Sequence, residues 1–281
     1  MVRRLEPKDR TRLDAFLRVH TDSSLFLRSN LATAGMIDHG KPMHATYAGA
    51  FEGADLCAVV AHCWNGNLLL QAPTHVEAVA NAAMTASGRP LTGILGPWDQ
   101  ACAARDALAP GRPTRLESHD GLFALDLPAL VRPPMLEVPG VRCRATRPSD
   151  LDLVVDWRAA YEVELLSAIP SAEHRARVRA DVERQHAGGL LFLLEVAGTP
   201  VATSAFNARL PDVVQVGGVY TPPPLRNRGH ARTAVAGSLV AIAQTGVSRA
   251  ILFTGEDNSA ARRAYEAIGF RRVGDYGLVL F

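Results

Sequence analysis

Apolar residues in the second half of the chain follow two spacings, which predict an alternation of strands and helices. Short apolar or alternating stretches bounded by turn residues are typical of strands, and apolar residues every three to four positions are typical of helices. Strands are expected at residues 141–144, 190–196, 201–206, 213–220 and 250–253, with terminal strands reaching Phe281. Helices are expected after Thr146, a candidate N-cap, and at residues 172–187, 229–244 and 259–268. This order predicts a mixed α/β (α+β) fold with a mixed sheet.

A proline-rich segment divides the chain. Residues 127–140 contain four prolines and end in a glycine, and proline favours extended backbone without an amide donor. At 281 residues the chain is also longer than most single domains. We therefore expect an N-terminal domain at residues 1–127, a linker at 128–140 and a second domain at 141–281.

Short matches between the halves indicate that the first half repeats the plan of the second. One group of matches lies near the start of each half and another near its end. The first, at an offset of 141, is Arg3, Pro7 and Asp9 against Arg144, Pro148 and Asp150; the second, at an offset of 158, is Asp99, Ala103, Arg105 and Gly111 against Asp257, Ala261, Arg263 and Gly269. We expect two similar domains in tandem.

Composition and charge argue against several classes of protein. Hydrophobic residues make up 48% of the chain and the formal net charge is +2, which fits a globular protein without a basic stripe for nucleic acid. The four cysteines show neither CxxC spacing nor histidines at zinc-ligand intervals. No apolar stretch reaches the about 18 residues of a membrane span, and no signal peptide is recognisable. We expect a cytoplasmic protein with reduced thiols and no metal, nucleic-acid partner or membrane partner.

The most informative stretch leads from a strand through a turn into an amphipathic helix, at residues 216–231. A helix N-terminus presents unpaired amides and a partial positive charge, which suits a phosphate. Gly229 would let the backbone approach that phosphate, small Ala231 keeps the next turn clear, and Arg226 and Arg228 add charge at the rim. The alternative is a tight turn before a purely structural helix.

Two consecutive glycines, Gly217 and Gly218, stand late in the strand before this turn. Glycine in a strand indicates a bulge or a close backbone approach. A bulge here would splay the strand from its neighbour and open a slot, whose unpaired amides could hold an extended chain that itself carries amides.

Two motifs resemble those of the GNAT superfamily of acyltransferases. Residues 226–231 resemble its Q/R-x-x-G-x-G/A diphosphate loop, and residues 258–270 resemble its later N-x-x-A-x-x-x-Y-x-x-x-G-F/Y block. The segment from Val219 to Arg226 is similar to the VYTPPxxR loops of a bacterial group of predicted acetyltransferases. The resemblance covers residues 141–281 and implies the GNAT fold, a twisted mixed sheet flanked by helices whose parted central strands hold acetyl-coenzyme A.

The resemblance also implies roles for individual residues. Backbone groups of Val219 and Thr221 would contact pantetheine, and the side chain of Asn258 would contact the coenzyme. Tyr265 stands where the family commonly has a general acid, although its place on the apolar face of its helix leaves a core tyrosine as the alternative. The expected coenzyme-binding residues are Val219, Tyr220, Thr221, Arg226, Asn227, Arg228, Gly229, His230, Ala231 and Asn258.

The sequence departs from the family pattern at the general base. Many relatives carry a glutamate on the strand before the loop, whereas residues 213–219 contain no carboxylate, and Gln215 cannot take a proton. Glu162 and Glu164 are candidates on an earlier helix. Because Glu162 lies four residues after Arg158, the pair is more typical of a surface ion pair than of catalytic machinery. The base stays unassigned.

The first half lacks both motifs. At the offset of 158, Gln100 replaces Asn258 and Ala107 replaces Tyr265. A GNAT-like copy of this kind would have lost coenzyme chemistry, and we expect it to line the acceptor site instead.

Together these features predict an acetyl-CoA-dependent N-acetyltransferase that passes its acyl group directly to an amine in a ternary complex. The acceptor would be a small-molecule or peptide amine, and amides near Val219 and Tyr220 would stabilise the developing oxyanion. The alternative is a noncatalytic module that binds or senses acyl-CoA. The identity of the acceptor, the length of the acyl group and the oligomeric state stay open.

Overall fold

The computed structural model describes residues 1–281, which divide into two compact units. Unit 1 comprises Met1–Leu122 together with Val273–Phe281, and unit 2 comprises Phe123–Arg272. The units thus divide the chain at different residues from the boundary expected at the proline-rich segment. None of the helices combines the length and the apolar composition needed to cross a membrane.

Unit 1 is built on a mixed sheet in the order β1-β2-β3-β4-β5-β12. In this order β4 and β5 are parallel and the other neighbours are antiparallel. The strands are β1 (Val2–Arg4), β2 (Ala45–Glu52), β3 (Asp55–Cys63), β4 (Asn67–Gln71), β5 (Gly93–Pro97) and β12 (Arg271–Leu280); the helices are α1 (Arg10–Val19), α2 (Leu25–Ala34), α3 (Val76–Ser87) and α4 (Trp98–Leu108).

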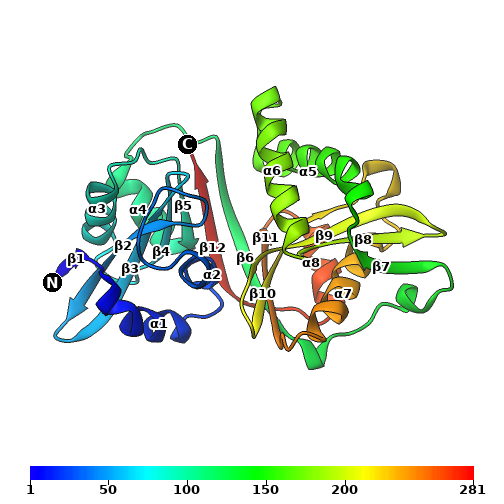
Figure 1. Ribbon diagram of the computed structural model, residues 1–281, viewed down its shortest axis with the longest axis horizontal. Helices are drawn as coiled ribbons and strands as arrows, with labels where there is room; N and C mark the ends of the chain where they lie inside the picture. The colour runs from blue at the N-terminus through cyan, green and yellow to red at the C-terminus, as the bar shows by residue number, and fades with distance from the viewer. The chain divides into compact units, whose positions relative to one another are not determined.

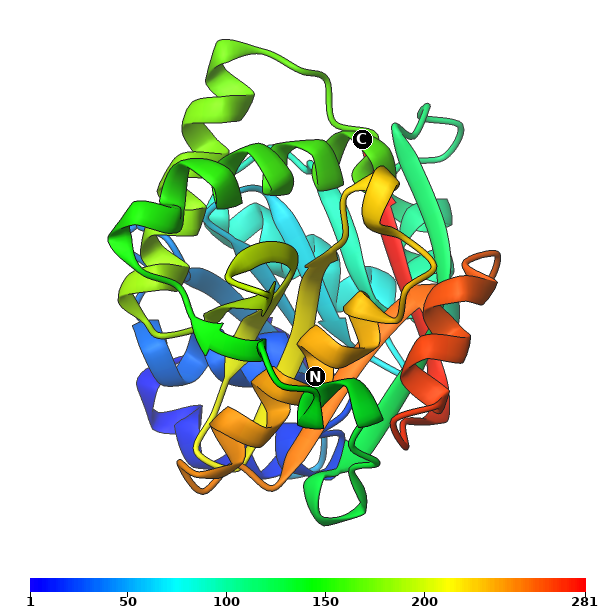
Figure 2. The ribbon, with the colours of Figure 1, turned by 90° about the vertical axis from the view of Figure 1, so that its right-hand side faces the viewer.

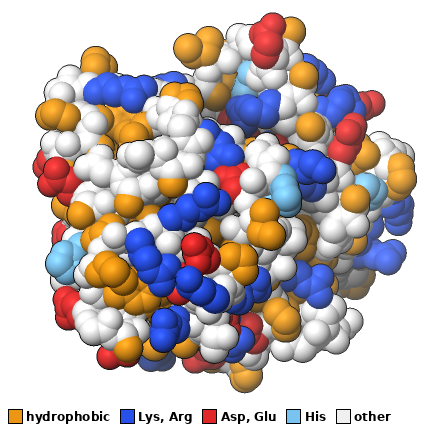
Figure 3. All heavy atoms as spheres, turned by 60° about the vertical axis from the view of Figure 1, so that its left-hand side comes forward, with side chains coloured by type: hydrophobic (Ala, Val, Ile, Leu, Met, Phe, Trp, Pro, Cys, Tyr) orange, Lys and Arg blue, Asp and Glu red, His pale blue; other side chains and the backbone are white.

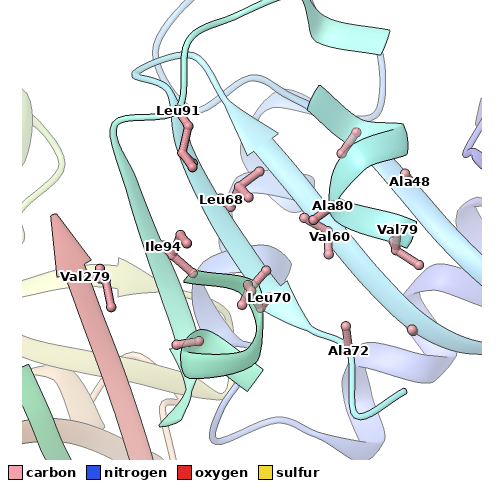
Figure 4. Packing of buried hydrophobic residues seen from close by; sticks show 14 of the residues in the cluster. Ala48, Val60, Leu68, Leu70, Ala72, Val79, Ala80, Leu91, Ile94 and Val279 are labelled. Carbon is pink, nitrogen blue, oxygen red and sulfur yellow. The ribbon is translucent and has the colours of Figure 1, made fainter. Parts of the chain in front are cut away.

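Helices cover both faces of the sheet of unit 1, because its strand residues point alternately to opposite sides. Val60 and Leu70 point to one face, where they pack with Val79 of α3 (Figure 4). Val59, next to Val60, points to the other face and packs in a cluster with Leu13 of α1. Both clusters are buried, so each face has its own core.

Unit 2 repeats this architecture with a sheet in the order β11-β10-β9-β8-β7. Here β10 and β11 are parallel and the other neighbours are antiparallel. The strands are β7 (Val141–Ala145), β8 (Leu191–Val196), β9 (Thr199–Arg209), β10 (Val213–Tyr220) and β11 (Arg249–Gly255); the helices are α5 (Leu151–Leu166), α6 (Ala172–Ala187), α7 (His230–Ala243) and α8 (Ser259–Glu266). Helices α5 and α6 pack on one face and α7 on the other (Figures 1 and 2).

The last strand of each half contributes to the other unit. The C-terminal strand β12 pairs antiparallel with β5, and its Val279 is fully buried in the core of unit 1 (Figure 4). The strand that ends the first half, β6 (Leu116–Asp126), continues into unit 2 from Phe123, where it lies next to β11. Phe123 and Leu125 are buried in the core of unit 2.

The two halves have the same order of elements: a strand, two helices, three strands, a helix, a strand, a helix and a strand. The repeat extends to side chains. Both terminal nitrogens of Arg3 donate hydrogen bonds to the Asp9 carboxylate at 2.7 Å. Both terminal nitrogens of Arg144 donate to Asp150 in the same way, at 2.7 and 3.1 Å. The structure therefore confirms the predicted α/β fold class with two similar domains in tandem.

Local details differ from the sequence expectations in two places. Thr146 is not the helix cap, because its hydroxyl lies 2.9 Å from Nδ1 of His186. A 3₁₀ turn at Pro148–Asp150 precedes α5, and the carboxylate of Asp150 accepts the Arg147 amide at 2.6 Å. The terminal strands expected up to Phe281 are the single strand β12.

On the face drawn in Figure 3, Lys and Arg side chains are interspersed with acidic and apolar ones.

Candidate functional site

The strands β10 and β11 separate halfway along β10. They pair in parallel only from Val213 to Gln215 of β10, although β10 continues to Tyr220. On its other side the register with β9 shifts between Gly217 and Tyr220, which is the bulge expected from the two glycines. The end of β10 therefore has a free edge toward β11, whose amides and carbonyls are available to a ligand.

Both glycines of the bulge occupy places where a side chain would collide. A Cβ added to Gly217 would lie 2.0 Å from Nδ2 of Asn207, and one added to Gly218 would lie 2.4 Å from Nη1 of Arg158. Gly218 also has a φ of +58°, in the left-handed region that favours glycine. The left-handed φ of Gly218 therefore favours glycine in the bulge, and the bulge brings Arg158 of α5 against the backbone of β10.

A cleft of about 620 Å³ opens between the parted strands, within the usual range of ligand sites, about 300–1,000 Å³. Its walls are the free edge of β10, the following loop, the start of α7 and one face of α8. The predicted site residues that line it are Val219, Tyr220, Thr221, Arg226, Asn227, Gly229, His230, Ala231, Asn258 and Tyr265. Arg228 does not line the cleft; its guanidinium is exposed and lies 3.4 Å from the Pro224 carbonyl.

The loop before α7 forms a cradle of backbone amides. Asn227 and Gly229 have φ values of +64° and +78°, and Gly229 is the N-cap of α7. The first helical hydrogen bond runs from the Thr233 amide to the Gly229 carbonyl at 3.1 Å, and no amide of residues 227–232 donates to a backbone carbonyl. Consecutive free amides at a helix N-terminus are the usual protein site for a phosphate.

Arg226 holds this loop in place. Its Nε donates to the Thr221 carbonyl at 2.9 Å, and its two terminal nitrogens donate to the Glu164 carboxylate at 2.8 and 2.7 Å. Hydrogen bonding to Arg226 lowers the pKa of Glu164, so the carboxylate stays charged. The charge of Arg226 is therefore already matched by a carboxylate of α5, and its contribution is to fix the loop that carries the amides.

Polar atoms without partners point to a polar ligand. Thr221 Oγ1 and His230 Nδ1 belong to residues that line the cleft, and both atoms are buried without a hydrogen bond. Burial and the nearby charge of Arg228 lower the pKa of His230, so its ring is neutral at neutral pH. Buried polar atoms in native proteins are nearly always paired, and these two lack partners beside the amide cradle.

Asn258 and Tyr265 bound the far side of the cleft on α8. The Asn258 side-chain oxygen caps α8 by accepting the Ala261 amide at 3.1 Å, which leaves its NH₂ group as a donor. The ring of Tyr265 packs at 6.1 Å against Phe270, and its hydroxyl has no hydrogen bond to the protein. Burial, with Tyr161 nearby, raises the pKa of Tyr265 above its ordinary value, so this phenol stays protonated at neutral pH.

Glu162 is not in a surface ion pair, contrary to the sequence expectation. Its side chain is 4% exposed, and its oxygens contact Arg158 Nε at 3.0 Å, Arg177 Nη2 at 2.8 Å and His174 Nε2 at 3.2 Å. Burial by itself would raise the pKa of Glu162, but the two arginines keep it below its usual value. Like Glu164, it is a carboxylate already held by arginine, and neither is a free base.

The corresponding place in unit 1 is closed. His75 is the N-cap of α3, and its φ of +55° resembles that of Gly229, but here an imidazole stands at the N-cap. The side-chain oxygen of Gln100, which matches Asn258, accepts the amide of Ala72 directly after β4 at 2.6 Å. The backbone at the end of β4 is thus occupied by a side chain of its own unit.

Comparisons with known proteins agree with this description. Residues 152–270 match the model of the acetyltransferase (GNAT) family, and no curated protein matches the sequence. A Drosophila protein matches with a TM-score of 0.67 and 14% identity, covering 100% of this chain and 98% of its own. A GCN5-related N-acetyltransferase from Sphaerobacter thermophilus matches with a TM-score of 0.59 and 17% identity, over 99% and 94% of the two chains.

The arrangement in two halves also occurs among solved structures. A tandem GNAT protein from the clavulanic acid biosynthesis pathway matches with a TM-score of 0.53 and 14% identity, over 99% of this chain and 97% of that one. At such identities the likeness concerns the fold of the whole chain.

Proposed function

From the match of residues 152–270 to the acetyltransferase (GNAT) family, we propose that the protein is an acetyl-CoA-dependent N-acyltransferase. It transfers the acyl group directly to an amine bound beside the coenzyme. The observation that carries the proposal is the cleft between β10 and β11, where a free strand edge leads to the amide cradle before α7. An extended, amide-bearing chain that ends in a diphosphate matches both parts.

The fit of coenzyme A rests on groups that otherwise lack partners. The amides of residues 227–231 would receive the diphosphate, and the backbone of Val219 in β10 and of Thr221 just after it would bond the pantetheine amides as a neighbouring strand does. The NH₂ group of Asn258 would donate to the coenzyme from α8. In this arrangement the acyl end lies near the bulge at Gly218, opposite Tyr265.

The chemistry assigned to this chain is positioning, charge stabilisation and one proton transfer. The amine nitrogen forms a bond to the thioester carbonyl carbon, whose oxygen becomes negative, and backbone amides near Val219 stabilise that charge. The carbon–sulfur bond then breaks, and Tyr265 gives its hydroxyl proton to the departing thiolate. The ammonium proton leaves to water, after which Tyr265 is reprotonated from solvent.

Solvent takes the role of the base because Glu162 and Glu164 are both engaged by arginines. This predicts that the rate rises with pH as the acceptor amine loses its proton. The cleft residue His230 is neutral, but it lies at the amide cradle rather than at the bulge, so we do not assign it this role.

The first half has no coenzyme chemistry in this proposal, because Gln100 occupies the end of β4 and no phenol stands at Ala107. That the first half lines the acceptor site, as expected from the sequence, stays a prediction. All four cysteines are free, which is compatible with the cytoplasmic location expected from the sequence. That location, like a bacterial origin, stays a prediction.

The second candidate is a sensor that binds acyl-CoA without turnover, and the absence of a free carboxylate in the cleft favours it. An amine panel with acetyl-CoA and detection of released thiol separates the two. We expect thiol release that depends on the amine and that is lost in Gly229→Glu, whose side chain would fill the amide cradle. Tight binding of acetyl-CoA without thiol release on any amine would instead establish the sensor.

A further inference from the structure

Arg158 of α5 lies at the acyl end of the cleft. Its Nη1 is 2.4 Å from the place of a Cβ on Gly218, and its guanidinium carbon lies 5.1 Å above the ring of Tyr161. Gly218 and Tyr161 both line the cleft. If the amide cradle binds the other end of the coenzyme, as proposed above, Arg158 lies beside the bulge where the acyl end would be.

The guanidinium of Arg158 is only partly used by the protein. Its Nε donates to Glu162 at 3.0 Å, while Nη1 and Nη2 donate to no protein group. The side chain of Arg158 is 18% exposed, so its guanidinium is mostly buried but still reaches solvent. Two parallel donors at the edge of a guanidinium match the two oxygens of a carboxylate.

The charges around Arg158 leave one positive charge unmatched. The groups that contact Glu162 are Arg158 and His174 at 3.0 and 3.2 Å and Arg177 at 2.8 Å. Arg177 also lies 3.9 Å from Asp181, which pairs with Arg184 at 2.6 Å. Two carboxylates of this network therefore face three arginines, and the next ion pair along α5, Glu164 with Arg226, is balanced by itself. A single excess charge favours a monoanion over a phosphate dianion.

We propose that Arg158 binds a carboxylate of the acceptor, so that the acceptor is an amine that also carries a carboxylate, as an amino acid does. This inference rests on the proposed function and names the substrate class of the same site. Glu162 is the positioning residue: it holds Nε, which turns the Nη1 and Nη2 edge toward the bulge. Arg177 supplies the charge that offsets Glu162, and its own side chain is 56% exposed.

The test uses pairs of acceptors that differ only in the carboxylate: alanine with alaninamide, leucine with leucinamide and phenylalanine with phenylalaninamide. With acetyl-CoA and the full chain, we expect kcat/KM to favour the amino acid about 10- to 100-fold, the range of a charge-assisted pair. Arg158→Met should reduce this ratio to about one. Arg179→Met removes an arginine of the same helix as Arg177 that pairs with Asp152 and not with Glu162, and it should keep the preference.

Binding measurements keep the inference separate from turnover. With the cleft saturated by coenzyme A, calorimetry should give a Kd for the amino acid about 10- to 100-fold below that for its amide, and Arg158→Met should abolish the difference. Arg158→Lys, which keeps the charge and spares the packing against Tyr161, should restore part of it and controls for a folding defect in Arg158→Met.

Two results would overturn the inference. One is equal use and equal binding of amino acids and amides by the wild-type chain. The other is a preference for a donor with a carboxylate on its acyl group, such as succinyl-CoA, that disappears in Arg158→Met while acceptors are not distinguished. If no amine releases thiol at all, the proposed function fails, and the calorimetric pairs still decide whether Arg158 binds carboxylates.

Discussion

Replacing Tyr265 by phenylalanine distinguishes a catalytic phenol from a packed one. The change removes only the hydroxyl, and the ring keeps its contact with Phe270 at 6.1 Å. Because that hydroxyl has no hydrogen bond to the protein, the variant should lose less than the about 1 kcal/mol of unfolding free energy that a typical buried hydrogen bond contributes. Affinity for acetyl-CoA should also stay near that of the wild type.

The rate should respond quite differently. A thiolate whose conjugate acid has a pKa of about 8.5 departs more easily when a proton is supplied, and removing a positioned general acid costs about 10²–10⁴ in rate. This is equivalent to roughly 2.7–5.4 kcal/mol of activation free energy, at least twice the expected loss of stability. We therefore expect kcat to fall by that factor while the melting temperature changes little.

A chemical control locates the defect at the leaving group. An acetyl thioester of a more acidic thiol needs less proton assistance, so the Tyr265→Phe defect should shrink on such a donor. Tyr47→Phe is the matched variant: the Tyr47 hydroxyl in unit 1 is also buried and without a partner, and its removal should leave turnover unchanged. If Tyr265→Phe turns over an established acceptor within about threefold of the wild type, far short of that loss, the tyrosine is a core residue.

Three further predictions address the coenzyme, the units and the repeat. Gly229→Glu should abolish acetyl-CoA binding by calorimetry, whereas Gly198→Glu, at a turn glycine with the same φ of +78° and open space around it, should not; equal affinities would exclude the cradle. A fragment of residues 123–272 should fold and bind acetyl-CoA. A fragment of residues 138–281 lacks the buried end of β6, worth roughly 5–9 kcal/mol of unfolding free energy, and should show no cooperative melting; the opposite result would refute the assignment of that end of β6 to unit 2. The partner guanidinium lowers the pKa of Asp9 to about 2, so the wild type should exceed Asp9→Asn in urea stability above about pH 4, and this advantage should disappear as the pH falls to 2; a difference independent of pH would contradict it.

The sequence predicts the elements around the cleft well because their signals are local. The strand expected at 213–220 and the helix expected at 172–187 have those bounds in the structure. The bulge follows from two glycines, one of which takes a left-handed φ at the position where β10 leaves its neighbour. Glycine and proline dictate backbone geometry through their own sterics, so they are readable without tertiary information.

Contacts between distant elements escaped prediction because the chain contains no local sign of them. The i, i+4 spacing of Arg158 and Glu162 fits a surface pair equally well, and only the packing of α6 brings His174 and Arg177 onto the same carboxylate. The pair of Arg226 with Glu164 joins residues 62 positions apart. The pairing of β12 with β5 of unit 1 is another such contact, because the apolar pattern of a C-terminal strand fits either sheet equally well.

The two halves show how small the difference is between a coenzyme cleft and a closed sheet. At the helix N-cap both use a left-handed residue, Gly229 in one half and His75 in the other. In the next helix of each half, Asn258 is the N-cap of α8 and bonds within its own turn, whereas Gln100, the third residue of α4, reaches the amide of Ala72. A free strand edge needs an unfilled space beside it, and in unit 1 a side-chain amide of the following helix bonds to the backbone there. The fold is the same in both halves, so the proposed division of labour rests on what the second half leaves open.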